Sequence, residues 1–374
     1  MSETRRTFLR HAGGALVGLT LAPLAACERN EVMTLQQGQS LPFKTPVPDF
    51  YVINGGREAV DGWPGVPDLS RSDWTLEVEG LVDRSLTLSY SDLTEAEDLP
   101  EVSLLKTMRC VSDPTPTVLP ENLLYAGTAV WTGVPLRAVL QRAGIDREKT
   151  NRLRLYAEDG YNNNLPIGRV YGPDVKTGPI LAYRMNGQVL PRDHGFPVRV
   201  VAPRLYGYKN VKWLARIEAT DNDSVFGQYQ NRLGFVDDAD VRATSRVSDP
   251  LPGNEVPAGD VRVEGYALSG YAGVDRVDVA VDDGPFRPAS IQSRESVAEA
   301  NPDVQGTRQW QDRSSFEYPF AGVWALWSTT VTLSQGQRTI RVRTTDRAGN
   351  QQPPTDPDPN DGSNAIAEVE VTVT

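Results

Sequence analysis

The chain has 374 residues, a formal net charge of −11 at pH 7, two cysteines and two histidines. This length is enough for two domains of ordinary size, and the acidity disfavours nucleic acid as a partner because nucleic acid is itself a polyanion. With so few histidines and cysteines, the chain cannot form a His-rich zinc or copper site.

Residues 1–27 have the pattern of an export signal. Arg5 and Arg6 form a twin-arginine motif, and the apolar stretch 12–24 that follows is too short and too interrupted by Gly and Pro to span a bilayer. Residues 24–27 (Leu-Ala-Ala-Cys) match the bacterial lipobox, which predicts lipidation of Cys27. The alternative is an ordinary signal peptide with an incidental cysteine. We expect export of the folded protein by the twin-arginine route to the periplasmic or envelope side, with a lipid anchor as its only membrane attachment.

Cleavage before Cys27 would remove 26 of the 374 residues, among them three arginines and one glutamate, and would leave 348 residues with a formal charge of −13. Cys110 would then carry the one thiol that lipid does not modify, in an oxidising compartment where a lone thiol is a liability unless a ligand occupies it. The sequence has no Cys-x-x-Cys-His motif, so we expect no haem in this chain.

Residues 28–44 are polar and are expected to form a tether, followed by a first domain over 45–245 that mixes strands with a few helices. Alternation predicts a strand over 75–79, and residues 197–203 are a β-rich run between prolines. Over 133–144 apolar residues recur at helical spacing, with Pro135 near the first turn and Gly144 at the end. This segment therefore predicts an amphipathic helix.

Residues 245–260 are rich in Pro, Gly and Asp, and we place the domain boundary there. Beyond it the hydrophobic period becomes two, for example at Val277, Val279 and Val281, with turn residues after each run. Short alternating strands of this kind predict an all-β sandwich of immunoglobulin type over 260–374. Between its strands, residues 292–318 form a long polar insertion without clear periodicity.

Five segments carry the clearest functional signal: 106–110 (Lys-Thr-Met-Arg-Cys), 127–136, 159–161 (Asp-Gly-Tyr), 181–199 and 207–213. In this order and spacing the chain resembles the sulfite oxidase family of molybdopterin enzymes over about residues 45–355. The resemblance implies an α+β fold, in which a sulfite oxidase-type molybdopterin-binding domain precedes an immunoglobulin-like domain that forms a homodimer. It also implies a molybdenum–molybdopterin cofactor, a small-molecule substrate and an external electron carrier such as a c-type cytochrome.

The resemblance also implies roles for individual residues. Cys110 would be the thiolate ligand of the metal, since a soft sulfur donor suits a redox-active transition metal. The hydroxyl of Tyr161 would face the exchangeable oxygen of the metal and take part in catalysis. The expected contacts to the pterin are Asn54, Asp159, His194, Arg199, Asn210, Val211 and Lys212. The tryptophans at 131, 213, 324 and 327 are expected in the core.

The departures from the family concern the substrate. Ile53 stands where sulfite-oxidising members have an arginine, residues 111–115 (Val-Ser-Asp-Pro-Thr) replace Ala-Gly-Asn-Arg-Arg, and a third arginine is missing near residues 320–323. Without those cations a small dianion should bind less well, because the pocket cannot offset its charge. Arg109 and Arg204 are the candidates that could restore positive charge.

The sequence therefore predicts an envelope oxidoreductase that carries out two-electron oxygen-atom transfer with an altered substrate pocket. Two alternatives stay open: a reductase of sulfoxide or N-oxide substrates, and a non-catalytic envelope lipoprotein that uses its β-sandwich for binding. An assay with a reduced dye and a panel of sulfoxides and N-oxides distinguishes the reductase from an oxidising enzyme. The presence together of Cys110, Tyr161, His194, Arg199 and Lys212 argues against the non-catalytic lipoprotein.

Overall fold

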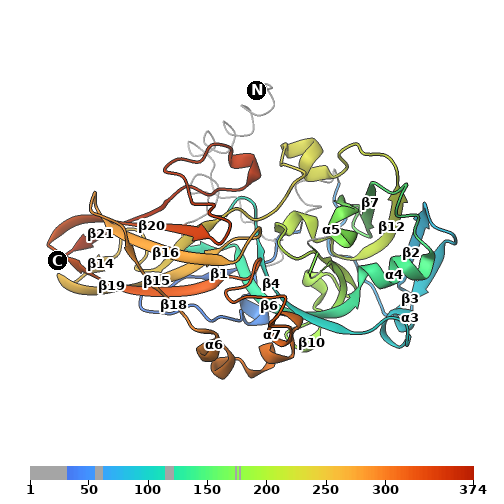
Figure 1. The fold of residues 1–374 in the computed structure, drawn as a ribbon, viewed down its shortest axis with the longest axis horizontal. Coiled ribbons are helices and arrows are strands. Elements are labelled where there is room, and N and C mark those ends of the chain that lie inside the picture. The colour runs from blue at the N-terminus through green and yellow to red at the C-terminus, as the bar shows by residue number, and fades with distance from the viewer. Residues whose placement is uncertain (1–31, 55–61, 114–121, 173–174, 177) are drawn as a thin grey trace.

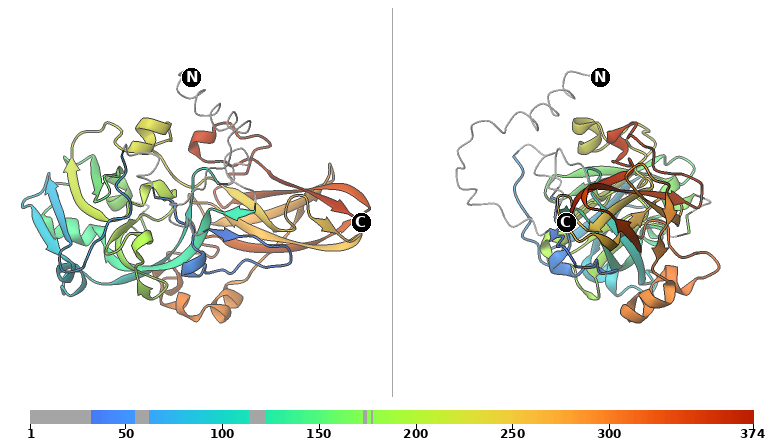
Figure 2. Two further views of the ribbon diagram at one scale, coloured as in Figure 1. Left: turned by 180° about the vertical axis from the view of Figure 1, so that it is seen from behind. Right: turned by 90° about the vertical axis from the view of Figure 1, so that its left-hand side faces the viewer.

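The computed structural model describes residues 32–54, 62–113, 122–172, 175–176 and 178–374. A mixed α+β domain and an all-β domain lie end to end, and the C-terminus is at the far end of the β domain (Figures 1 and 2). Within these ranges no helix is long and apolar enough to cross a membrane. Cys27 and the predicted signal lie outside the described residues.

Two five-stranded sheets form the first domain. One has the order β10-β9-β6-β4, with β11 paired to β9, and the other has the order β3-β2-β12-β7-β8. The first sheet comprises β4 (Val102–Arg109), β6 (Ala126–Pro135), β9 (Ile180–Met185), β10 (Gln188–Val189) and β11 (Arg199–Val201). The second comprises β2 (Thr75–Gly80), β3 (Leu86–Ser89), β7 (Arg152–Ala157), β8 (Asn162–Pro166) and β12 (Leu214–Thr220). The strand predicted over 75–79 is confirmed as β2.

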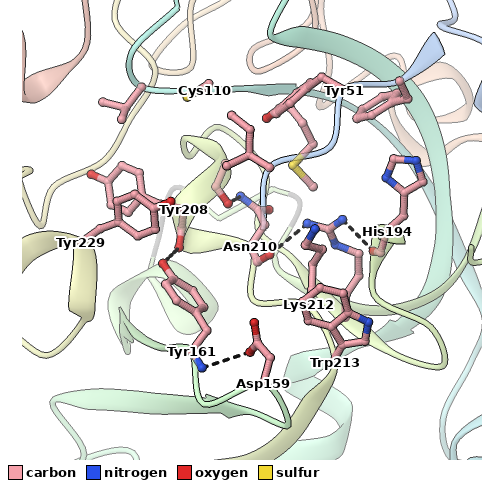
Figure 3. A pocket seen from close by; sticks show the side chains of 16 residues that line it. Tyr51, Cys110, Asp159, Tyr161, His194, Tyr208, Asn210, Lys212, Trp213 and Tyr229 are labelled. Atoms are coloured by element: carbon pink, nitrogen blue, oxygen red, sulfur yellow. Dashed lines mark hydrogen bonds between the residues drawn. The ribbon is translucent and has the colours of Figure 1, made fainter. Parts of the chain in front are cut away.

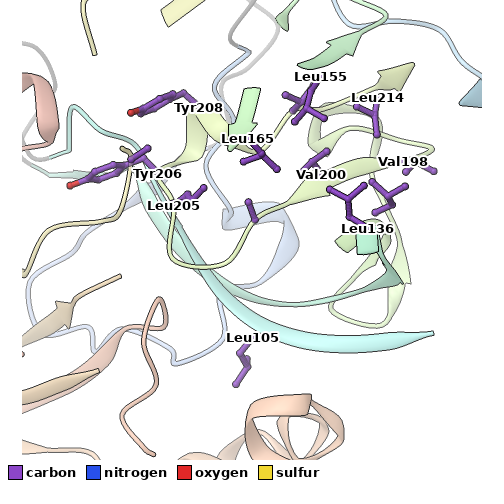
Figure 4. Close-up of a cluster of buried hydrophobic side chains, with 14 of the residues drawn as sticks. Leu105, Leu136, Leu155, Leu165, Val198, Val200, Leu205, Tyr206, Tyr208 and Leu214 are labelled. Carbon is purple, nitrogen blue, oxygen red and sulfur yellow. The ribbon is translucent and has the colours of Figure 1, made fainter. Parts of the chain in front are cut away.

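Aliphatic side chains of both sheets meet in one buried core (Figure 4). Leu155 of β7 and Leu214 of β12 come from the second sheet, and Val200 of β11 comes from the first. Leu205, Tyr206 and Tyr208 extend the same cluster into the loop that follows β11. This loop is therefore anchored by apolar packing before it reaches the functional site.

The predicted amphipathic helix forms, but it begins later than the pattern indicated. α4 spans Leu136–Ala143, and it ends as predicted at Gly144 in the left-handed conformation, with φ +70°. Gly133 and the residues up to Pro135 complete β6 instead. A Cβ at Gly133 would lie 2.0 Å from the carbonyl oxygen of Leu181, so this glycine permits close strand pairing with β9. Strand pairing thus overrides the local helical pattern there.

The second domain is a sandwich of two sheets with the orders β13-β15-β19-β18 and β14-β21-β20-β16-β17. The first contains β13 (Thr244–Asp249), β15 (Gly259–Leu268), β18 (Ser290–Ile291) and β19 (Ala325–Leu333). The second contains β14 (Glu255–Val256), β16 (Val274–Val281), β17 (Arg287–Pro288), β20 (Gly336–Asp346) and β21 (Ala367–Val373). Inward-facing residues of both sheets, such as Val263 and Ile340, form a separate core. The alternating strands predicted from the sequence are confirmed.

The change of domain falls earlier than the composition indicated. β13 already pairs with β15 of the sandwich over Thr244–Asp249, so the Pro- and Gly-rich stretch after it is a turn inside the second domain. The expected tether also differs, since from residue 32 the chain packs onto the body. β1 (Met33–Thr34) pairs with β5 (Leu123–Leu124), and Leu35 and Phe43 are buried.

The polar insertion 292–318 joins the two domains. It contains α6 (Arg294–Ala300) and α7 (Arg308–Gln311). The side chain of Gln309 accepts a hydrogen bond from the backbone N–H of Leu105 at 3.1 Å and donates one to its carbonyl at 2.7 Å. The insertion therefore connects the second domain to β4, the strand that leads to Cys110.

The tryptophans expected in the core are confirmed there, since all four are at most 2% exposed.

Candidate active site

A pocket with about 740 Å³ of empty space lies where β4 and β11 and the loops after β7 and β11 converge (Figure 3). It is lined by Phe50, Tyr51, Ile53, Met108, Cys110, Val111, Asp159, Tyr161, His194, Arg199, Gly207, Tyr208, Asn210, Lys212, Trp213 and Tyr229. Seven of the nine residues predicted to be catalytic or to contact the cofactor are among them, although they come from segments far apart in the chain. The structure therefore brings most of the candidate residues to one place.

Cys110 directly follows β4 and is half-buried. Its backbone N–H donates to the carbonyl of Tyr125 at 2.9 Å, and its own carbonyl accepts from the N–H of Asp113 at 3.2 Å. These two bonds fix the segment on both sides of the thiol. Burial raises the pKa of Tyr51 well above its ordinary value, and the neighbouring Cys110 raises it further, so Tyr51 stays protonated at neutral pH.

Arg199 is a buried cation at the centre of the pocket wall. Its guanidinium donates to the carbonyl of His194 at 2.8 Å and to the carbonyl of Asn210 at 2.9 Å, and it stacks over Trp131 at 5.1 Å from the ring centroid. Burial lowers its pKa to about 10, so it remains charged at neutral pH. One side chain thus holds two loops of the pocket and contributes positive charge to it.

Lys212 is the second cation of the pocket. Its ammonium donates to the side-chain oxygen of Asn54 and, at 2.7 Å, to the carbonyl of Asp193. Burial, and then the charge of Arg199, lower its pKa to about 7. An anion placed in the pocket would favour the protonated form and raise this pKa again. Asn54 itself does not line the pocket but orients the cation that does.

His194 contributes a neutral imidazole. Burial lowers its pKa to about 3, with further lowering by Lys212 and Arg199. The ring meets Phe50 edge to face, with 5.6 Å between centroids, and Gly195 follows it with φ +105°. A Cβ at Gly195 would lie 2.9 Å from the Cβ of Lys212, so glycine permits the close approach of these two segments.

Tyr161 lines the pocket, but its hydroxyl is already engaged. It donates to the carbonyl of Tyr208 at 2.6 Å and accepts from the side-chain amide of Asn163 at 2.8 Å. The carboxylate of Asp159 accepts from the N–H of Tyr161 at 3.0 Å and from the indole of Trp63 at 3.1 Å. The Tyr161 hydroxyl therefore ties the turn after β7 to the loop after β11.

Asn210 and Val211 hold the backbone of the loop after β11 in place. The side-chain oxygen of Asn210 accepts from the N–H of Ala202 at 2.7 Å, and its amide nitrogen donates to the carbonyl of Tyr206 at 2.8 Å. Val211 is fully buried in the core and does not line the pocket, and its carbonyl accepts from Val200 at 2.8 Å. Both residues therefore shape the loop that carries Lys212.

Neither candidate substrate arginine lines the pocket. Arg109 is fully buried, and its guanidinium donates to the hydroxyl of Tyr206 in the loop after β11 at 3.1 Å and to the carbonyl of Ser363 in the second domain at 2.8 Å. Side chains alternate along a strand, so Arg109 faces away from Met108 and Cys110. Arg204 pairs with Asp240 at 3.2 Å and lines the separate cleft between the domains. The expectation that these two arginines supply positive charge to the pocket is therefore wrong for this structure.

Several lining residues escaped the sequence reasoning. They are Tyr51, Tyr208 and Tyr229, which line the same pocket as Cys110 and form its aromatic wall. A signal for one of them existed, because Tyr51 and Ile53 are two apart in an extended segment and so share a face. The tyrosines at 208 and 229 come together only through the fold, with 6.0 Å between their ring centroids.

Comparison with known proteins agrees with this organisation. Residues 63–226 match the family described as oxidoreductase molybdopterin binding domain, and residues 238–358 match the Mo-co oxidoreductase dimerisation domain. The chain is 33% identical to sulfite oxidase of Gallus gallus over 322 residues, covering 77% of this chain and 65% of that protein. It is 33% identical to a nitrate reductase of Solanum lycopersicum over 209 residues, covering 51% of this chain and 22% of that protein.

Among solved structures, the sulfane dehydrogenase SoxCD of Paracoccus pantotrophus superposes with a TM-score of 0.70 at 18% identity, covering 96% of this chain and 91% of that one. Together, the fold and the two matched domains define a molybdopterin-binding oxidoreductase domain joined to a dimerisation domain. The chain belongs to the sulfite oxidase family of molybdopterin-dependent oxidoreductases.

The residues of the pocket fit the cofactor that this family implies. Cys110 offers a soft sulfur donor at one end. Arg199 and Lys212 line the pocket as cations whose hydrogen bonds, within the described residues, go to neutral oxygens. A group that carries phosphate and sulfur anions would offset both charges, which are costly to leave uncompensated away from water.

Proposed function

We propose that this protein is a molybdopterin-dependent oxidoreductase that carries out two-electron oxygen-atom transfer on a small molecule. The observation that carries the proposal is the convergence of Cys110, Arg199 and Lys212 on one pocket. The names of its relatives, sulfite oxidase and nitrate reductase, support a reaction of this class.

The role proposed for each residue follows from its contacts. Cys110 binds the metal as a thiolate, and the bound cofactor supplies two-electron redox chemistry coupled to oxygen transfer. Arg199 and Lys212 neutralise negative charge on the cofactor, and Asn54 orients Lys212. His194, neutral by burial, presents an imidazole that can donate or accept one hydrogen bond.

The remaining site residues position these groups. Asn210 and Val211 hold the loop that carries Lys212, and Asp159 fixes the turn before Tyr161. Tyr161 keeps the proposed catalytic role that the family resemblance implies, and it also supports the same loop through the carbonyl of Tyr208. The positioning roles stabilise the cofactor site through backbone geometry, so they predict changes in cofactor retention more than changes in the chemical step.

The proposed substrate is neutral or bulkier than sulfite. Near Cys110 the wall consists of Ile53, Met108 and Val111 together with tyrosines, and among the described residues the cations that line the pocket are Arg199 and Lys212, which in this proposal neutralise the cofactor. A small dianion beside a negatively charged metal site needs positive partners, because like charges repel strongly in a partly dry cavity. This wall therefore favours a molecule with apolar substituents, including a sulfoxide or N-oxide in the reducing direction.

Location and partners belong to the same proposal. We propose twin-arginine export, an anchor at lipidated Cys27, and exchange of electrons with an external carrier such as a c-type cytochrome. The dimerisation domain supports a homodimer. Fractionation tests the anchor, since Cys27→Ala should release soluble protein from the membrane, whereas unchanged membrane attachment would contradict lipidation.

Metal and pterin analysis of the exported protein, followed by assays of sulfite oxidation and of dye-driven sulfoxide and N-oxide reduction, tests the function. We expect about one molybdenum and one pterin per chain, with turnover that disappears in Cys110→Ser in the soluble Cys27→Ala background. Full turnover in that variant would refute the proposed role of Cys110. Protein without molybdenum or pterin would favour the non-catalytic lipoprotein.

A further inference from the structure

The tyrosines of the pocket differ in what their hydroxyl groups do. The hydroxyl of Tyr161 donates to the carbonyl of Tyr208, and the hydroxyl of Tyr208 donates to the carbonyl of Val236 at 2.6 Å. Within the described residues, the hydroxyl of Tyr51 has no protein hydrogen-bond partner. It lines the same cavity as Cys110. Its proton is therefore available to a ligand, whereas the hydroxyl of Tyr161 already has protein partners.

The ring of Tyr51 is held in place by aromatic packing. It stacks on Phe50 with 5.7 Å between centroids and 14° between planes, and Tyr125 meets it edge-on at 6.3 Å. The residue is 8% exposed, so only its polar tip reaches the cavity. Figure 3 shows this tip directed toward Cys110. A donor on a ring packed in this way needs little reorganisation when a ligand arrives.

Gly207 leaves the space that this hydroxyl occupies. A Cβ at Gly207 would lie 2.9 Å from the hydroxyl oxygen of Tyr51 and 3.4 Å from the carbonyl oxygen of Arg109. Any larger side chain would therefore press on the tip of Tyr51. The glycine and the tyrosine together define a polar point in a wall that Ile53, Met108 and Val111 otherwise make apolar.

We propose that Tyr51 is a catalytic phenol of this site besides Tyr161, and that it donates a hydrogen bond to an oxygen atom of the substrate or product beside Cys110. The proposal rests on the proposed oxygen-atom transfer and deepens it. The oxygen that changes partners gains negative character during transfer, and a fixed donor stabilises that charge. Because the surrounding wall is apolar, the ligand class is a molecule with one hydrogen-bond-accepting oxygen and apolar substituents, such as a sulfoxide.

The test compares Tyr51→Phe with Tyr161→Phe, and Tyr183→Phe serves as a matched control. Tyr183 is buried outside the pocket and donates to Glu101 at 2.9 Å, so its substitution removes a phenolic hydroxyl without touching the site. Molybdenum and pterin content and the melting temperature are measured first, to show that each variant is folded and loaded. Dimethyl sulfoxide with reduced methyl viologen measures turnover. Dimethyl sulfone, which keeps the oxygen acceptors, measures binding through the intrinsic tryptophan fluorescence, to which Trp213 in the pocket wall contributes.

We expect Tyr51→Phe to lower kcat/KM and to weaken sulfone binding, each about tenfold, since one hydrogen bond to a ligand is worth roughly this factor. Tyr161→Phe should change sulfone binding less than about threefold and should act mainly on cofactor content and melting temperature. Equal sulfone dissociation constants in Tyr51→Phe and the unchanged protein would overturn the proposal. A binding loss confined to Tyr161→Phe would also overturn it. If sulfoxide turnover is missing while sulfone binding still depends on Tyr51, the proposed reaction fails but the role of Tyr51 as ligand donor stands.

Discussion

Replacing Ile53 by arginine tests whether the pocket is short of positive charge. Ile53 lines the pocket, half-buried, next to Asn54 and on the same face of its segment as Tyr51. An arginine there could form a charge-assisted contact with sulfite, worth roughly 1.5–3 kcal/mol. A factor of ten corresponds to about 1.4 kcal/mol, so the sulfite KM should fall about tenfold or more. Repulsion from Arg199 and Lys212 keeps the expected gain at the lower end of that range.

The assay is steady-state sulfite oxidation with ferricyanide as acceptor, at several ionic strengths. Ile53→Met is the matched control, because it keeps a neutral side chain of similar volume and should leave the KM almost unchanged. The unchanged protein should show a high KM with a shallow salt dependence, and Ile53→Arg should steepen it. A micromolar KM in the unchanged protein, weakened strongly by salt, would refute the reasoning.

Three further outcomes follow from the contacts. Arg199→Met should lower the melting temperature of the loaded protein, because the carbonyls of His194 and Asn210 lose a buried donor and the cofactor loses a cation, and thermal unfolding of the loaded protein measures it; an unchanged melting temperature would contradict this. Burial lowers the pKa of Lys106 to about 7, below its ordinary value in the unfolded chain, so the unfolded state binds more protons above pH 7. Lys106 alone should thus contribute on the order of 3 kcal/mol to a rise in the stability of the cofactor-free protein from pH 7 to 10, and Lys106→Met should remove this part of the rise; an equal slope in both proteins would argue against it. Arg109→Met should lower the melting temperature but leave the KM of loaded enzyme within about twofold, and a large KM change would return Arg109 to the substrate site.

The elements that could be predicted from the sequence are those with strong local signals. Period-two alternation located β16, β20 and β21, and Gly144 marked the end of α4 because only its left-handed conformation closes that helix easily. The start of α4 could not be predicted, since Gly133 and Pro135 join β6 through pairing with β9, which is a contact distant in sequence. The domain boundary was placed too late for a similar reason, because the turn after β13 has the composition of a linker.

The candidate site was predicted from the order of its motifs. This order identifies the residues but not the directions in which their side chains point. Alternation along β4 could have placed Arg109 on the opposite face from Cys110. The hydrogen bond from Tyr161 to Tyr208 could not be predicted, because it joins loops 47 residues apart. The same holds for the aromatic wall, whose members meet only in the folded chain.

The central claim is that Cys110 is a thiolate ligand of molybdenum in this pocket. X-ray absorption at the molybdenum edge of the loaded protein, compared between the Cys27→Ala background and the same protein with Cys110→Ser, tests it most directly. We predict that molybdenum in Cys110→Ser has one sulfur neighbour fewer at bonding distance, while Arg199 and Lys212 maintain the pterin content. An identical number of sulfur neighbours in both proteins would contradict the account.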